Sequence, residues 1–251
     1  MLKLLGTRIK QGNRTTKFPK EVPVLPVLYQ GLPHINADAC RQGCQDCIDA
    51  CPTQAISVEA NGPQIDLGRC LFCRECTEAC PENAIEYTLD YRMATRTREA
   101  MVVDKHGIEL ADAIDRKSRA LFGHSLKLRQ VSAGGCNACE AEVNALGNIV
   151  FDIGRFGIQM VASPRHADGL LITGPITQNM QLALLKTYAA VPSPKLVIAI
   201  GGCAISGGPF RDQPQVNNGA DSVIPVDLYV PGCPPHPVTI LDGLLRLLGR
   251  I

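Results

Sequence analysis

Twelve cysteines dominate the chemistry that this 251-residue sequence could support. Eight of them lie within residues 40–80 in two runs, and each run ends in a Cys-Pro pair. Closely spaced thiolates followed by Cys-Pro are typical of 4Fe–4S ligands, and the last cysteine of each run ligates the cluster held by the other run. We therefore expect two clusters, one on Cys40, Cys44, Cys47 and Cys80, and one on Cys70, Cys73, Cys76 and Cys51.

The two runs belong to one repeated unit. Their last three cysteines recur after 29 residues, whereas the first unit opens with C-x-x-x-C where the second has C-x-x-C. Short strands are predicted at residues 56–59, 64–66 and 85–89, beside two short cysteine-bearing helices. This pattern resembles the bacterial two-cluster ferredoxin domain, which implies an α+β ferredoxin-like fold over residues 31–92. A zinc-stabilised interaction module with no redox role is the alternative, but a zinc site needs only four ligands and no third cysteine in each run.

The remaining four cysteines, Cys136, Cys139, Cys203 and Cys233, lie in glycine- and proline-rich surroundings. Around them strands predicted at 126–131, 158–161, 169–173, 196–200 and 226–230 alternate with helices predicted at 139–146, 178–191 and 238–248. This alternation predicts an α/β, flavodoxin-like parallel sheet with helices on both faces. The four thiols follow three of these strands, and the carboxyl ends of parallel strands share one edge of the sheet. We therefore expect a third 4Fe–4S cluster there.

Composition excludes some classes of function and indicates the compartment, and the two segments outside the cysteine-bearing regions have patterns of their own. A net charge of +1, 4% aromatic residues and no tryptophan argue against nucleic-acid binding. We find no signal peptide and no apolar run of about 18 residues, so we expect a reducing cytoplasm, where many thiols indicate metal ligands. We interpret residues 1–30 as a basic docking extension in which a short amphipathic helix over 1–9 could lie on a partner or a membrane face. A solvated tail is the alternative. Residues 93–124 form a linker whose pattern predicts a helix over 108–122.

Other residues near the third group have two interpretations. Cys203 alone could be a small buried hydrophobe, and the glycines at 201–208 could hold a phosphate, although a P-loop lysine is missing. Glu140 and Glu142 could cap a helix, the commoner role, or relay protons. Arg165 or His166 could modulate a cluster or a proton path; we favour a structural ion pair between Arg165 and Asp168, with His166 packed in the core.

Four segments carry a further resemblance: residues 134–142, 155–174, 201–210 and 225–235. Over residues 125–251 the chain resembles the small subunit of membrane-bound, energy-converting NiFe hydrogenases, including formate hydrogenlyase, and the related subunit of respiratory complex I. The complex I subunit carries two adjacent cysteines, whereas Cys136 and Cys139 form the C-x-x-C of hydrogenase small subunits. The N-terminal half resembles the separate ferredoxin-like subunit of the same assemblies, so the chain looks like the two fused.

The resemblance implies an oxidoreductase subunit that is not catalytic alone. It would pass electrons through three 4Fe–4S clusters to a NiFe site in a hydrogenase-type large subunit. It further implies membrane ion-translocating subunits, a donor such as ferredoxin or a formate dehydrogenase subunit, and a peripheral place on the cytoplasmic face of the membrane. A nickel-free, quinone- or sulfur-reducing complex with the same clusters is the main alternative.

Overall fold

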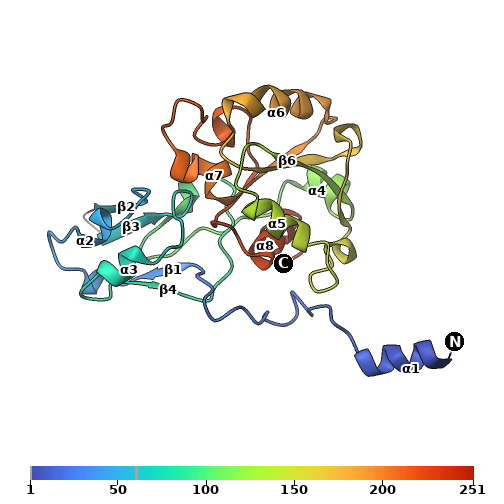
Figure 1. Cartoon of the computed structure of the whole chain (residues 1–251), viewed down its shortest axis with the longest axis horizontal. Coiled ribbons are helices and arrows are strands. Elements are labelled where there is room, and N and C mark those ends of the chain that lie inside the picture. Colours follow the sequence, from blue (N-terminus) through green and yellow to red (C-terminus); the bar gives the residue numbers. More distant parts are fainter. Residues whose placement is uncertain (1, 60–61) are drawn as a thin grey trace.

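The computed structural model describes residues 2–59 and 62–251, and Met1 of the expected N-terminal helix lies outside them. Figure 1 shows two regions side by side. One, formed by the first half of the chain, has short strands and helices; the other is built on a larger sheet flanked by helices.

Short antiparallel strands organise the N-terminal region. The strands β1 and β4 pair with each other, and β2, β3 and β5 form a second sheet in that order. The expected strands at 56–59, 64–66 and 85–89 are present, and β1 and β5 were not predicted. The elements are α1 (Leu2–Gln11), β1 (Pro33–Ile35), α2 (Asp46–Asp49), β2 (Ile56–Glu59), β3 (Gly62–Asp66), α3 (Glu75–Ala79), β4 (Ile85–Tyr87) and β5 (Val102–Val103).

The linker forms a shorter helix than its sequence pattern predicts. Within the predicted range of 108–122 only α4 (Arg116–Phe122) is helical, and it begins where the Asp115 side chain accepts hydrogen bonds from the N–H groups of Lys117 and Ser118. The prediction over 108–115 was wrong because this stretch bonds to distant backbone: the Ala111 N–H donates to Ala94 O at 2.7 Å and the Ile114 N–H to Leu247 O at 3.0 Å. Tertiary hydrogen bonds thus override local helix propensity.

Five parallel strands form the sheet of the C-terminal region, in the order β10-β9-β8-β6-β7. This is the flavodoxin-like strand order of doubly wound α/β sheets. All five predicted strands are present, two with unchanged bounds. The strands are β6 (Leu126–Ser132), β7 (Ile158–Met160), β8 (Gly169–Thr173), β9 (Leu196–Ile200) and β10 (Leu228–Val230).

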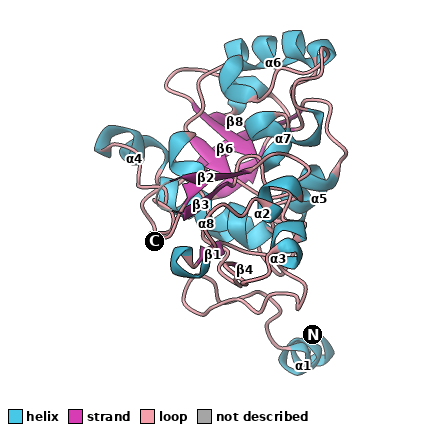
Figure 2. Ribbon diagram, turned by 90° about the vertical axis from the view of Figure 1, so that its left-hand side faces the viewer, coloured by secondary structure: helices cyan, strands magenta, loops and turns pink. Residues whose placement is uncertain are grey.

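Helices cover both faces of this sheet (Figure 2). The central strands β8 and β9 are fully buried, and their alternate residues belong to two separate cores. Leu171 and Ile198 pack in the core that contains α8, whereas Leu170 and Val197 pack in the core shared with the N-terminal region. The helices are α5 (Ala138–Ala145), α6 (Gln178–Ala190), α7 (Gly201–Ser206) and α8 (Pro237–Leu247).

The first residues stand apart from the rest of the chain in Figures 1 and 2. The expected helix is present as α1, and none of its residues is buried. Attachment begins after it, where Phe18 is buried against the C-terminal region and Thr16 N–H donates to Val150 O at 2.9 Å. None of the helices in the described residues has the length and apolar character needed to cross a bilayer.

Candidate iron–sulfur centres

The first quartet of cysteines surrounds one cavity. Cys47 lies in α2 and Cys80 directly follows α3, so the two cysteine runs meet here. Burial raises the pKa of the Cys47 thiol to about 11, assisted by the neighbouring Cys80 and Cys40. Arg41 and Glu82 bring opposite charges to the same walls. The cysteines that line this cavity are Cys40, Cys44, Cys47 and Cys80.

The second quartet surrounds a cavity of the same construction. Cys51, from the first run, faces three cysteines of the second run there. Burial raises the pKa of the Cys70 thiol to about 12, although hydrogen bonds from Tyr87 and the Phe72 N–H oppose the shift. The cysteines that line this cavity are Cys51, Cys70, Cys73 and Cys76.

The Cys-Pro turns point backbone N–H groups at sulfur in both places. The Ala55 N–H donates to Cys51 Sγ at 3.2 Å, and the Ala84 N–H donates to Cys80 Sγ at 3.3 Å. These bonds occupy equivalent positions of the repeated unit. Donors aimed at sulfur stabilise the negative charge of a ligated cluster, so both cavities fit 4Fe–4S groups held by four thiolates.

The third group of cysteines gathers at the carboxyl edge of the parallel sheet. Cys136 and Cys139 follow β6, while Cys203 follows β9 and Cys233 follows β10. Burial raises the pKa of Cys139, and the nearby Cys203, Cys233 and Cys136 thiols raise it further. The four sulfurs are thus close enough to influence one another, and they provide the four thiolates that a further cluster requires.

Close approach of backbone to sulfur explains a glycine at this edge. Gly201 has a φ of +85°, and a Cβ built there would lie 2.5 Å from Cys139 Sγ. It opens α7, so Cys203 lies in a short buried helix and not in the loop that the glycines suggested. Sequence reasoning missed α7 because two glycines at its start are unfavourable in a helix.

Polar residues near the third group have structural roles that differ from those expected. The Glu140 carboxylate joins α5 to the sheet, where its Oε1 accepts hydrogen bonds from Ser132 Oγ at 2.5 Å and Thr173 Oγ1 at 2.8 Å. This replaces the expected helix-capping role. Burial raises the pKa of Glu142, which lines a cavity of ≈ 290 Å³ beside Cys233.

The expected ion pair between Arg165 and Asp168 was wrong. Asp168 Oδ2 instead accepts the Lys127 N–H at 2.7 Å, and the salt bridges of the described residues do not include Arg165. His166 is exposed, so it is not a core histidine either. Backbone pairing of β6 with this turn provides a better partner for the carboxylate than a flexible exposed guanidinium.

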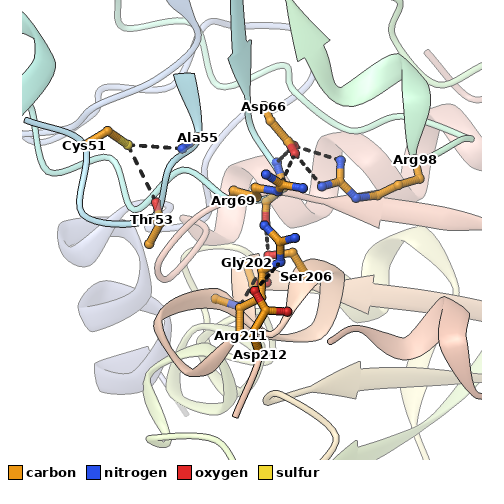
Figure 3. Close-up of polar contacts among 12 residues, drawn as sticks. Cys51, Thr53, Ala55, Asp66, Arg69, Arg98, Gly202, Ser206, Arg211 and Asp212 are labelled. Carbon is orange, nitrogen blue, oxygen red and sulfur yellow. Dashed lines mark hydrogen bonds and ion pairs between the residues drawn. The ribbon is translucent and has the colours of Figure 1, made fainter. Parts of the chain in front are cut away.

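The second and third groups meet where α7 packs on the loop before Cys70. Ser206 Oγ donates to Gly68 O at 2.8 Å, and a Cβ built on Gly202 would lie 3.7 Å from Cys70 O. Asp66 holds this loop through a two-point ion pair with Arg98, in which the N···O distances are 2.8 and 2.6 Å (Figure 3). The loop that carries Cys70 is therefore fixed against the helix that carries Cys203.

No group of three or more His, Cys, Asp or Glu side chains is placed to hold a single metal ion anywhere in residues 2–59 and 62–251. The eight cysteines of the first two groups instead share the walls of two larger cavities. Ligands of one zinc ion lie about 2.3 Å from it, whereas ligands of a 4Fe–4S cluster are distributed over its four irons.

Each of the two regions matches a known protein family. Residues 39–84 match the 4Fe-4S dicluster domain, and residues 136–247 match the family described as NADH ubiquinone oxidoreductase, 20 Kd subunit. A probable membrane-bound hydrogenase subunit mbhJ from Pyrococcus furiosus is 43% identical over 52% of this chain and 78% of its own length. The chain belongs to the NADH ubiquinone oxidoreductase 20 kDa subunit family.

Two further relatives are named as subunits of two different enzyme complexes. Formate hydrogenlyase subunit 7 of Escherichia coli is 41% identical over 59% of this chain, which spans 61% of that protein's length. An NADH-quinone oxidoreductase subunit of Heliobacterium modesticaldum is 47% identical over 47% of this chain and 69% of its own length. Members of oxidoreductase complexes with and without hydrogenase names are therefore similarly related to this chain.

Proposed function

We propose that the chain is an electron-transfer subunit that relays electrons through three 4Fe–4S clusters to a NiFe site in a partner large subunit of a membrane-bound hydrogenase. Residues 31–92 form a two-cluster, ferredoxin-like domain, and residues 125–251 form the domain that holds the third cluster. They are joined by the linker at 93–124, and residues 1–30 serve as the docking extension. The observation that carries this proposal is the meeting of twelve cysteines in three adjoining groups of four.

The contact between the second and third groups supports a continuous route. Gly202 and Ser206 of α7 lie against the loop that carries Cys70, so the elements that carry Cys203 and Cys70 are in direct contact. Thiolates and N–H donors of the chain hold the clusters, and the clusters supply the one-electron chemistry. The dihydrogen chemistry belongs to the partner, and the chain does not catalyse it alone.

The proposed assembly includes the hydrogenase-type large subunit, membrane ion-translocating subunits and a donor such as ferredoxin or a formate dehydrogenase subunit. The chain lies at the periphery of the membrane on its cytoplasmic face. The exposed apolar side chains of α1, including Leu2, Leu4 and Ile9, together with the basic residues of the same segment, support docking there.

Metal analysis of the anaerobically purified chain tests the proposal. We expect about twelve irons and twelve sulfides per chain, as three clusters of four, a brown colour, and reduced clusters detectable by electron paramagnetic resonance (EPR). Colourless protein with bound zinc would support the zinc-stabilised module instead and overturn the electron-transfer role.

A nickel-free complex that reduces quinone or sulfur is the second candidate, and the similarity to an NADH-quinone oxidoreductase subunit favours it. Co-purification of the intact complex separates the two. Nickel in the large subunit and hydrogen evolution from a reduced donor support the hydrogenase. Quinone or sulfur reduction without nickel supports the alternative.

A further inference from the structure

The two cysteine groups of the N-terminal region differ in the hydroxyl groups around them. Tyr87 Oη lies 3.1 Å from Cys70 Sγ and 3.8 Å from Cys76 Sγ. Thr53 Oγ1 lies 3.8 Å from Cys51 Sγ, and Figure 3 shows it beside that sulfur. A cysteine that ligates iron has lost its proton, so both hydroxyls are donors when the cluster is bound. All three of these sulfurs belong to the second quartet.

A third hydroxyl lies at the same quartet. Thr77 follows Cys76 in α3, and its Oγ1 is buried without a hydrogen-bond partner in the described residues. An unpaired buried hydroxyl is costly. A sulfur atom of a bound cluster or of Cys76 would provide the acceptor that it lacks.

The internal repeat shows that these hydroxyls are not a general feature of the fold. The counterparts of these residues in the repeat, 29 positions away, are Val58 for Tyr87, Ile48 for Thr77 and Glu82 for Thr53. Of the three, Glu82 lines the cavity of the first quartet. None of these side chains can donate an O–H when Glu82 is ionised.

The first quartet receives correspondingly few hydrogen bonds. Among residues 2–59 and 62–251, only the Ala84 N–H donates to one of its sulfurs from another residue. Arg41 and Glu82, which carry opposite charges, both line its cavity.

Hydrogen bonds to cluster sulfurs affect the two oxidation states unequally. Reduction adds one negative charge to the cluster, and a donor aimed at its sulfurs stabilises that extra charge, which raises the midpoint potential.

We propose that Tyr87, together with Thr53 and Thr77, holds the second cluster at a higher midpoint potential than the first. An external donor gives one electron to the first cluster. The first cluster then passes this electron to the second cluster and is reoxidised, so the electron moves towards the third group at Cys203. This inference rests on the proposed electron-transfer function and adds a direction to it. The broken symmetry of the repeat provides that direction.

EPR-monitored redox titration of the full, cluster-loaded chain tests the inference. We expect Tyr87→Phe to lower one of the three midpoint potentials, and Thr53→Val to lower the same one by a smaller amount because its contact is longer. Tyr91→Phe is the matched control, because the Tyr91 ring packs on Phe18. We expect this variant to leave all three midpoint potentials unchanged. Cys80→Ser identifies the signal of the first cluster by perturbing it.

A gain-of-function variant makes the test independent of Tyr87. Ile48 directly follows Cys47, as Thr77 follows Cys76. Ile48→Thr therefore introduces a hydroxyl at the corresponding position of the first repeat, and we expect it to raise the midpoint potential of the first cluster. Three clusters with unshifted midpoints in all variants, or a first cluster above the second in the wild type, would overturn the inference alone. Iron-free wild-type protein would overturn the proposed function with it.

Discussion

Ser206 Oγ donates a hydrogen bond of 2.8 Å to the backbone oxygen of Gly68, and both groups are buried between the two regions of the chain. Ser206 ends the helix that carries Cys203, and Gly68 lies two residues before Cys70. This bond therefore joins the helix that carries Cys203 of the third group to the loop that carries Cys70 of the second. In the proposed electron-transfer role, this contact would keep the distance between the second and third clusters constant.

Replacing Ser206 by alanine should weaken this junction. Ser206→Ala leaves the buried Gly68 carbonyl unpaired, at a cost of about 1–3 kcal/mol. Anaerobic denaturant unfolding measures the change, with Ser57→Ala, an exposed serine on β2, as the control that should stay within about 0.5 kcal/mol. Equal stability of the two variants would show that the junction does not depend on this bond.

The crossing of ligands between the two cysteine runs can be tested by counting iron in double variants. Cys51 and Cys70 line the same cavity, whereas Cys51 and Cys47 line different ones. From about twelve irons, Cys51→Ala with Cys70→Ala should retain about eight, because one cluster is lost. Cys51→Ala with Cys47→Ala should retain about four. The reverse order of the two counts would contradict the pairing.

Ligand spacing and strand patterns made much of the molecule predictable. The cysteine runs are local in sequence, and the buried strands β8 and β9 are continuous apolar segments, so both could be found without a structure. The linker helix failed because the N–H groups of Ala111 and Ile114 bond to residues that are far away in sequence. No local pattern contains that information.

The position of Tyr87 at the second quartet could not be predicted from its own segment. Its contact with Cys70 depends on how β4 lies against the loop before α3. Comparison with Val58, its counterpart in the repeat, would have marked it as unusual. The difference between the two repeats, and not their similarity, was the available signal.

Two adjacent glycines allow a matched test of the third group. A Cβ on Gly201 would meet Cys139 Sγ at 2.5 Å, and its φ of +85° disfavours any side chain, whereas a Cβ on Gly202 meets nothing closer than 3.5 Å. We expect Gly201→Ala to lose the third cluster, which reduces the iron content from about twelve to about eight. Gly202→Ala should retain all three, measured by iron content and EPR spin count. Loss of the cluster in both variants would indicate general disruption of α7.

The pH dependence of stability should be sensitive to His236, which caps α8. Its Nδ1 accepts the Val238 N–H at 3.2 Å, which requires an unprotonated Nδ1, and burial lowers its pKa below the ordinary 6.5. Below about pH 6.5 the unfolded chain therefore binds a proton that the folded chain resists. Linkage then makes the free energy of unfolding fall with decreasing pH, by at most ~1.4 kcal/mol per pH unit.

Asparagine at this position separates capping from titration. His236→Asn keeps a side-chain acceptor that is favoured at a helix N-cap but removes the ionisable ring. We expect its free energy of unfolding, measured between pH 7.5 and 5.5, to fall less steeply than that of the wild type, whatever the offset at pH 7.5. His34→Asn, at an exposed position of β1, should keep the wild-type slope. Parallel slopes for wild type and His236→Asn would mean that the imidazole is not held neutral by the fold.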